Sequence, residues 1–414
     1  MTNTKRVVIT GMGTVNPLGN SVKEFWENIK ANKLGFSYIN DFDTENLGVK
    51  IVGDIKNFSV DGIVSPKDAK RMERFTQIAV VSAKEALIDA GLDFSEEDIE
   101  NPFRKGVIVG CGTGGISLTE QEHSKFLNKG AGRVSPFYIP MMIINMVAGE
   151  IAMRSKFKGV NYSPVTACSS GTHAVGEAFR KIKYGELDMC LCGGTESCVT
   201  EFAMAGFANM KALSKSDDLA RASIPFDKER NGFVLGEGAG ILLLEEYEQA
   251  KARGAKIYAE ICGYGATCDA YHMTSPSPTG EAAAFAMKQA FTETPLETLS
   301  YINAHGTSTP LNDKYETTAI KTAFGDKAKD IKINSTKSMT GHLLGGAGAV
   351  EAIVTALSVK NDFIHRTVGY KLPDEECDLD YCVNGNVETT VYSAISNSLG
   401  FGGHNASVCF KKAE

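Results

Sequence analysis

The chain has 414 residues, of which 43% are hydrophobic and 22% charged, and its formal net charge at pH 7 is −7. This length exceeds one ordinary hydrophobic core and favours two domains or two fused halves. The acidic balance argues against a nucleic-acid-binding protein, because a phosphate partner needs a basic face.

The N-terminus and the cysteines indicate a cytoplasmic protein. Residues 1–13 run straight into a strand-like stretch without a secretory h-region, and no apolar run approaches the roughly 18 residues of a membrane helix. The ten cysteines are spread along the chain without paired CxxC motifs, and several, such as Cys190 and Cys192, lie in apolar runs. We therefore expect reduced, buried thiols, no zinc site and no membrane partner.

Strand-like and helical segments alternate along the chain. The predicted strands are residues 6–13, 106–115, 189–197, 240–248, 256–265, 300–308, 330–336 and 393–403. The predicted helices are residues 66–91, 171–184, 281–293, 313–323 and 345–359. This alternation predicts an α/β fold. A charged helix ends at Gly254 before a new strand, so we divide the chain into residues 1–254 and 255–414.

The glycine-rich stretch GCGTGG at residues 110–115 follows a predicted strand and matches the pattern GxGxxG. A dinucleotide site also needs an acidic residue about twenty positions later, and that region reads KGAGRVSP. We interpret residues 110–115 as a packing turn.

Cys168 stands where an apolar strand gives way to a predicted helix. Ala174, Val175, Ala178 and Phe179 follow it at the spacing of a helix with one buried face. The amides and positive dipole end of a helix N-terminus favour a thiolate, so we expect the pKa of Cys168 to be below its ordinary value. The alternative is that Cys168 is a small hydrophobic core residue.

Two histidines share this kind of setting. His305 and His342 each follow an apolar run and stand beside glycine, where backbone approaches a ligand closely. Residues 166–188 and 336–362 also resemble each other, as a Thr-led turn, small residues and a helix. Two similar halves packed face to face would bring both turns to one centre; the other possibility is that small residues simply recur at helix starts.

Four ordered motifs, VTACSSGTHA, NAHGTSTPLND, STKSMTGHLLGGAGAVE and SNSLGFGGHNAS, resemble the β-ketoacyl-[acyl-carrier-protein] synthases of the thiolase superfamily. CDAYHMTSPSP and FDKERNGFVLGEGAG resemble their synthase II type, and the likeness covers essentially the whole chain. The resemblance implies a thiolase-like five-layered αβαβα fold of two duplicated halves, with the site at their junction, and a homodimer. It also implies a decarboxylative condensation of an acyl thioester with malonyl-[acyl-carrier protein] in fatty acid elongation.

The resemblance assigns roles residue by residue. Cys168 matches the nucleophile that carries the acyl chain, and His305 and His342 match the pair that binds the malonyl carbonyl and stabilises the enolate. Lys337 matches a lysine that supports the histidines. The backbone amides of Cys168 and Phe401 would form an oxyanion hole, and Phe401 would be a gate for acyl chains.

Acidic and amide residues complete the implied site. Asp313 and Glu351 match residues that hold the site's network, and we expect Lys337 to pair with Glu351. No cofactor is required by the resemblance, although a structural monovalent cation is associated with the positions Asn303, Glu351, Ser396 and Asn397.

The acidic carrier protein needs a basic landing site. The positions that match carrier contacts are Lys67, Lys70, Arg71, Arg74, Arg133 and Lys211. The alternative for the helical group is an ordinary solvated face.

The resemblance leaves two other functions open, a ketosynthase of a polyketide pathway and a non-catalytic partner subunit like a chain-length factor. The latter would lack the nucleophile, and Cys168 is present. Thr113 stands where some relatives carry a bulky aliphatic residue that limits the acyl pocket, so the sequence does not define the preferred acyl length.

Overall fold

The computed structural model describes residues 4–95, 97 and 99–413 and contains a sheet of ten strands in the order β10-β9-β13-β14-β8-β1-β7-β6-β4-β5. These strands are β1 (Val7–Val15), β4 (Lys105–Gly110), β5 (Asn161–Tyr162), β6 (Met189–Glu196), β7 (Gly238–Glu246), β8 (Glu260–Cys268), β9 (Leu299–Asn303), β10 (Lys332–Asn334), β13 (Ser393–Gly400) and β14 (His404–Lys411). Two short pairs lie outside it, β2 (Ser37–Tyr38) with β3 (Ile51–Val52), and β11 (Phe363–Ile364) with β12 (Val387–Glu388).

The helices connect and cover these strands. They are α1 (Val22–Lys30), α2 (Pro66–Ala69), α3 (Arg74–Asp89), α4 (Ile116–Lys129), α5 (Tyr138–Met142), α6 (Met146–Ser155), α7 (Ser170–Lys183), α8 (Glu201–Asn209), α9 (Tyr247–Ala252), α10 (Glu281–Ala290), α11 (Pro310–Phe324), α12 (Lys337–Thr340) and α13 (Ala347–Asn361). None of the described helices has the length and apolar character needed to cross a membrane.

The sheet consists of one strand pattern used twice. In the order β1-β7-β6-β4-β5 the first two pairings are antiparallel and the next two are parallel. The order β8-β14-β13-β9-β10 repeats this pattern pairing for pairing. The two halves join through β1 and β8, where Val7 pairs with Ile261. The duplication is therefore present in the topology.

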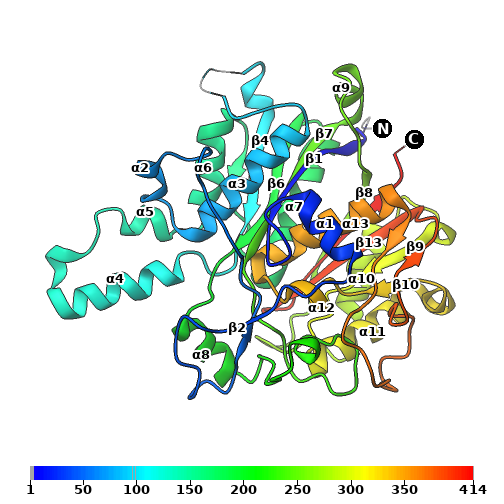
Figure 1. The fold of residues 1–414 in the computed structure, drawn as a ribbon. Coiled ribbons are helices and arrows are strands. Elements are labelled where there is room, and N and C mark those ends of the chain that lie inside the picture. Colours follow the sequence, from blue (N-terminus) through cyan, green and yellow to red (C-terminus); the bar gives the residue numbers. More distant parts are fainter. Residues whose placement is uncertain (1–3, 96, 98, 414) are drawn as a thin grey trace.

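Five layers result from this arrangement. Helices α7 and α13 pack between the two half-sheets, α3 covers the N-terminal half-sheet, and α10 with α11 covers the C-terminal one (Figure 1). Residues 347–359 of α13 are all buried, as expected of a helix covered on every side. The predicted αβαβα fold is confirmed.

The two central helices approach each other closely through glycines. A Cβ atom on Gly171 of α7 would lie 2.8 Å from the carbonyl oxygen of Gly345, and one on Gly348 of α13 would lie 2.0 Å from Thr172 Oγ1. Only glycine permits this separation, which fixes the start of α7 against the start of α13.

The predicted helix over residues 66–91 is wrong, because the chain breaks between α2 and α3. The break is stabilised by Glu73, whose buried side chain caps α3 by accepting from the Phe75 amide at 2.9 Å. The other predicted helices and strands are present, with ends displaced by a few residues. The boundary after Gly254 falls between α9 and β8 and stays a prediction.

Candidate active site

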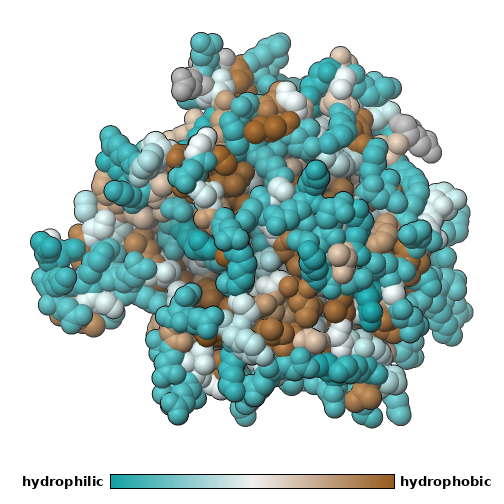
Figure 2. All heavy atoms as spheres, viewed as in Figure 1, coloured by the Kyte–Doolittle hydropathy of each residue, from teal (hydrophilic) through white to brown (hydrophobic). Residues whose placement is uncertain are grey.

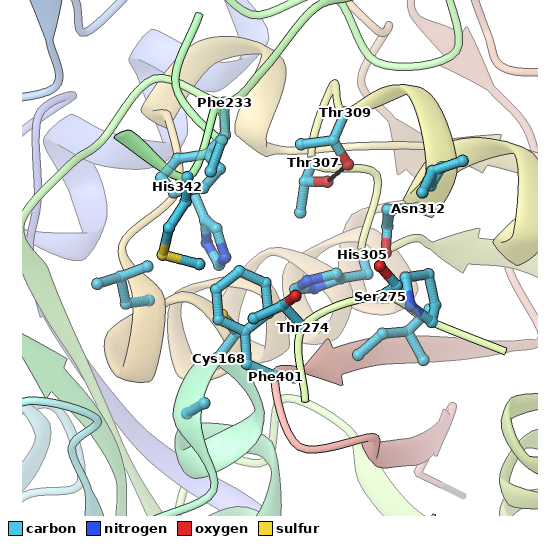
Figure 3. Close-up of a pocket in the computed structure, with 18 of the residues that line it drawn as sticks. Cys168, Phe233, Thr274, Ser275, His305, Thr307, Thr309, Asn312, His342 and Phe401 are labelled. Atoms are coloured by element: carbon cyan, nitrogen blue, oxygen red, sulfur yellow. Dashed lines mark hydrogen bonds between the residues drawn. The ribbon is translucent and has the colours of Figure 1, made fainter. Parts of the chain in front are cut away.

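A cavity of about 460 Å³ is lined by residues from both halves of the chain. Cys168 lies before α7, His305 follows β9, His342 follows α12, and Phe401 follows β13. The ligand atoms of Cys168, His305 and His342 all lie within 4.8 Å of one another. The two imidazoles and the Phe401 ring face the same space (Figure 3). The expected meeting of one sulfur and two imidazoles is confirmed.

Cys168 occupies a tight turn at the start of α7. Residues Ala167–Ser169 form a single 3-10 turn, and Ala167 has a φ of 50°, a left-handed conformation that residues with a side chain rarely adopt. The Ser170 hydroxyl secures the turn by accepting from the Thr166 amide at 2.9 Å and donating to the Ala167 carbonyl at 2.7 Å. The sulfur is thereby held at the helix start, as predicted.

The turn before α13 has the same backbone conformation. Leu344 has a φ of 44°, and Leu344–Gly346 form a 3-10 turn that leads into the helix. Gly345 therefore takes the place in the second half that Cys168 takes in the first. The resemblance between residues 166–188 and 336–362 reflects two equivalent segments of a duplicated fold.

The Cys168 thiol is buried, and burial raises its pKa to about 11. The nearby Lys337 ammonium and the backbone amide of Phe401 act in the opposite direction without overcoming burial. The expectation of a lowered pKa was therefore wrong for the free enzyme, because it considered the helix start without the desolvation of the sulfur. The resting residue is a thiol at neutral pH.

The two histidines form a neutral pair. Their ring centroids are 5.2 Å apart at an interplanar angle of 84°, and the Phe233 ring packs on His342 at 5.1 Å. Burial, reinforced by the charge of Lys337, lowers the pKa of both His305 and His342 well below 6.5. Both imidazoles are therefore neutral at pH 7, and each has one nitrogen that donates and one that accepts.

Lys337 fixes the tautomer of His305. Its Nζ lies 3.3 Å from His305 Nδ1 and also donates to the Glu351 carboxylate, with which it forms the predicted buried ion pair. An ammonium group can only donate, so Nδ1 is the accepting nitrogen and the proton of His305 is on Nε2. Burial raises the pKa of Glu351 to about 7, and the charge of Lys337 opposes this rise.

Glu316 is a site residue that sequence reasoning missed. Its carboxylate accepts from the backbone amides of His305 and Gly306, both at 2.8 Å, and so fixes the loop that carries the imidazole. It is one helical turn after Asp313 on α11. That spacing is the only sequence signal that pointed to it, because its partners are backbone groups.

Asp313 supports a neighbouring loop and does not reach the histidines directly. Its carboxylate accepts from the Phe226 amide at 2.8 Å and lies 3.8 Å from Arg230 Nε. Both Asp313 and Arg230 are buried. The contacts of Asp313 are therefore with the segment that contains Phe226, and its network role stays a prediction.

Glu196, at the end of β6, was also missed. It accepts from the amides of Gly112 at 2.8 Å, Thr113 at 3.1 Å and Gly345 at 3.1 Å, and from the Thr113 hydroxyl at 2.7 Å. These contacts join the turn at residues 110–115 to the turn before α13. The turn therefore has a packing role, as interpreted from the sequence.

The four positions associated with a cation lie in the buried interior of the second half. Asn303 on β9 is paired with Ser396 on β13, and α13 packs on the same strand. Among the described residues, Asn303 Oδ1, Ser396 Oγ and Glu351 Oε2 have no hydrogen-bond partner. Asn397 Oδ1, by contrast, accepts from Ser407 at 2.8 Å. Buried oxygens without donors are the ligands that a hard cation prefers.

The predicted carrier contacts differ in their solvent exposure and in their ion-pair partners. Lys67, Lys70, Arg71, Arg133 and Lys211 are exposed, and the Arg71 guanidinium lies 4.6 Å from the Phe137 ring centroid. Arg74 instead donates twice to the buried carboxylate of Glu237, at 2.8 and 2.6 Å. Arg74 is thus an ion-pair partner of Glu237 whose side chain is still 41% exposed, and its role as a carrier contact stays a prediction.

Phe401 lies in a loop with three glycines. Gly402 and Gly403 have φ values of 86° and 77°, and the Gly402 amide donates to the Met273 carbonyl at 2.7 Å. Asp269 donates its amide to the Gly403 carbonyl at 2.9 Å. The aromatic ring is therefore attached to a backbone that has little side-chain packing of its own.

Comparisons with known proteins agree with the geometry. The family described as "Beta-ketoacyl synthase, N-terminal domain" matches residues 4–250, and "Beta-ketoacyl synthase, C-terminal domain" matches residues 258–371. The chain is 49% identical to the 3-oxoacyl-[acyl-carrier-protein] synthase 2 of Staphylococcus aureus (strain COL), over 100% of both chains.

Two solved structures share the fold. A beta-ketoacyl synthase from Burkholderia phymatum STM815 superposes with a TM-score of 0.91 at 34% identity, over 99% of this chain and 100% of the other. A chain from a complex of a type II PKS acyl-carrier protein with its ketosynthase superposes with a TM-score of 0.90 at 33% identity, with the same coverage.

Proposed function

The chain belongs to the beta-ketoacyl synthase family, and from this premise we propose that it condenses an acyl group held on Cys168 with malonyl-[acyl-carrier protein] in fatty acid elongation. The products are a β-ketoacyl-[acyl-carrier protein] and CO2. The observation that carries the proposal is that Cys168, His305 and His342 meet within 4.8 Å in one cavity. Identity of 49% to a 3-oxoacyl synthase against 33% to a polyketide ketosynthase favours fatty acid synthesis over the polyketide alternative.

Acyl transfer begins when Cys168 Sγ attacks the thioester carbonyl of the acyl donor. The thiol proton passes to the His342 imidazole, which is neutral because its pKa is well below 6.5, whereas Lys337 occupies the accepting nitrogen of His305. The backbone amides of Cys168 and Phe401 lie beside the sulfur and stabilise the tetrahedral oxyanion. The carrier thiolate leaves with the proton, and the acyl group stays on the sulfur.

Decarboxylation needs donors for the malonyl thioester oxygen. His305 supplies Nε2–H, because Lys337 occupies its Nδ1. His342 lines the same cavity, and its neutral imidazole supplies the second N–H. The electron pair of the C–CO2 bond becomes the enolate that these two donors stabilise. The enolate carbon then attacks the acyl carbonyl, and Cys168 leaves as the thiolate.

A monovalent cation fits the second half of the site. The oxygens without partners, Asn303 Oδ1, Ser396 Oγ and Glu351 Oε2, support such a ligand set, with Asn397 beside them. A bound cation supplies positive charge that stabilises the Glu351 carboxylate. The residues themselves hold the ends of β9 and β13, which lead into the loops of His305 and Phe401.

An acyl carrier protein is the proposed macromolecular substrate. The basic residues Lys67, Lys70, Arg71, Arg133 and Lys211 support docking of an acidic carrier, since they are exposed on a chain whose net charge is −7. Lys211 also lines the cavity, so the exposed basic residues extend to the catalytic pocket itself.

A homodimer is the proposed working unit. Strand β5 is the last strand of the large sheet, and its outer edge has no partner strand among the described residues. Helix α4 projects from the body as an arm (Figure 1) with exposed apolar side chains at Phe126 and Leu127. On the face that Figure 2 displays, most of the surface is hydrophilic, so the exposed apolar side chains of Phe126 and Leu127 and the open edge of β5 favour a second copy as the occupant.

Two measurements test the proposed function. Incubation with acyl-[acyl-carrier protein] should add one acyl mass, located on Cys168, and the Cys168→Ala variant should show none. His305→Ala and His342→Ala should each lower malonyl decarboxylation on the order of 100- to 1000-fold, the cost of removing one oxyanion donor. Full condensation by Cys168→Ala, or normal decarboxylation in both histidine variants, would overturn the proposal.

A further inference from the structure

Two cysteines outside the catalytic cavity touch each other. Cys262 is on β8 and Cys409 is on β14, and their sulfur atoms are 3.2 Å apart. Cys409 has no exposed surface, and Cys262 is 8% exposed. Both are free thiols, and neither lines the cavity that contains Cys168.

An irregularity in the sheet brings the two sulfurs together. Cys409 is paired with Gly263, while the next residue, Phe410, is paired with Ile261, so Cys262 is the extra residue of β8 at this point. In such a bulge two residues oppose one on the partner strand, and the side chain of the extra residue is re-aimed.

The two thiols differ in a way that suits an attack of one on the other. The hydrogen bond with Cys409 and the charge of Lys411 lower the pKa of Cys262, whereas burial raises that of Cys409. Thr294 Oγ1 also donates to Cys262 Sγ at 3.4 Å. Cys262 is therefore the less buried of the two cysteines and the one that ionises first.

We propose that Cys262 and Cys409 are a reversible oxidation site that forms a disulfide with a two-electron oxidant such as hydrogen peroxide. The Cys262 thiolate attacks one peroxide oxygen, which breaks the O–O bond, gives a sulfenic acid and releases hydroxide that takes up the thiol proton. Cys409 then attacks the Cys262 sulfur, and water leaves with the second thiol proton. Two thiols and one peroxide thus give one disulfide and two waters, and an external dithiol reverses the reaction.

The disulfide would join two strands that lead into the catalytic loops. β8 ends shortly before Asp269, and β14 begins just after Gly403, which accepts the Asp269 amide. The cross-link closes a loop between residues 147 apart in sequence, so it restricts the unfolded chain strongly. The oxidised protein should unfold at a higher temperature than the reduced protein, and a dithiol should remove the difference.

The test uses the full chain in the Cys268→Ser background, which removes the exposed thiol on the same strand. The protein is treated with hydrogen peroxide, unfolded, alkylated with N-ethylmaleimide and mapped by mass spectrometry. We expect a peptide in which Cys262 is linked to Cys409, at a mass two hydrogens below the reduced pair. The linked peptide should disappear after treatment with dithiothreitol.

The Cys262→Ser variant is the matched control, because it keeps the size of the side chain. It should give no linked peptide, and Cys409 should remain alkylated in the unfolded protein. Cys262→Ala serves the same purpose if the serine variant does not fold. Complete alkylation of both Cys262 and Cys409 after the peroxide treatment would overturn the proposal.

Discussion

Burial governs the reactivity of Cys168. The sequence places this residue at a helix start, where a lower pKa is expected, but the folded chain desolvates the sulfur and raises its pKa to about 11. Below that pKa the thiolate fraction increases about tenfold for each pH unit, since each unit changes the protonation ratio by ten. The enzyme therefore depends on a base in the cavity to remove the proton.

The rate of Cys168 alkylation by iodoacetamide should follow this titration. We expect the rate to rise about tenfold per pH unit from pH 7 to pH 10 without a plateau, because only the thiolate reacts. A small thiol with an ordinary pKa of about 8.5 is the control and should level off within this range. A plateau for Cys168 near pH 7 would show that the helix start outweighs burial.

Glu316 acts on the reaction through the backbone of the His305 loop. Glu316→Gln replaces one acceptor oxygen with a donor that faces an amide, so the imidazole should shift, and misplacement of this kind costs about 100-fold in rate. The measurement is the rate of condensation beside the rate of Cys168 acylation, which should change much less. Glu376→Gln, on an exposed carboxylate paired with Lys314, should leave both rates unchanged. An equal loss in both rates for Glu316→Gln would instead indicate general disruption.

At the level of elements, the break between α2 and α3 divides the basic residues into two groups. Lys67 and Lys70 belong to the short exposed segment, whereas Arg74 begins the next helix and binds Glu237. A continuous helix would have presented all of them on one side. The break therefore separates two lysines that form no ion pair among the described residues from an arginine that is paired with a buried carboxylate.

Charge reversal in the exposed group should weaken carrier binding. We expect Lys67→Glu combined with Lys70→Glu to raise the KM for acyl-[acyl-carrier protein] about tenfold, equivalent to about 1.4 kcal/mol, and to leave the KM for acyl-coenzyme A unchanged. The effect should shrink at high salt. Lys288→Glu with Lys329→Glu makes the same change in net charge on the C-terminal half and is the control. Equal increases of the KM for acyl-[acyl-carrier protein] in the two double variants would contradict a local docking site.

Most helices and strands could be predicted from the sequence, whereas the roles of the buried glutamates that fix the loops could not. Apolar periodicity and glycine stops located α7, α13 and most strands, because each depends on local pattern. The break at Glu73 depends on one side chain that folds back on an amide, which periodicity does not record. Glu196 and Glu316 bind backbone groups from distant segments, so their roles exist only once the two halves have assembled.

At the scale of the whole molecule, a second copy would cover the open β5 edge and the exposed apolar side chains of the α4 arm and of α5, which packs on α4. Leu127 is 67% exposed and Ile139 is 56% exposed. Replacing both with Asp introduces charges that would have to be desolvated at an interface. We expect the Leu127→Asp/Ile139→Asp variant to elute as a monomer in size-exclusion chromatography with light scattering.

The control for this prediction is Phe285→Asp, which changes an equally exposed apolar residue on α10, in the other outer layer of the fold. This variant should keep the mass of the unmodified protein. A dimer that persists in the Leu127→Asp/Ile139→Asp variant would exclude the arm as the interface.

The repeated turn at the starts of α7 and α13 also determines how many acyl groups one protomer can carry. The second turn has the conformation of the first, but a Cβ atom on Gly345 would lie 2.5 Å from the Gly112 amide nitrogen and 2.9 Å from Glu196. That position has no room for a thiol of its own. Each protomer can therefore hold a single covalent acyl intermediate at a time, although its fold consists of two equivalent halves. A fully acylated homodimer would carry two.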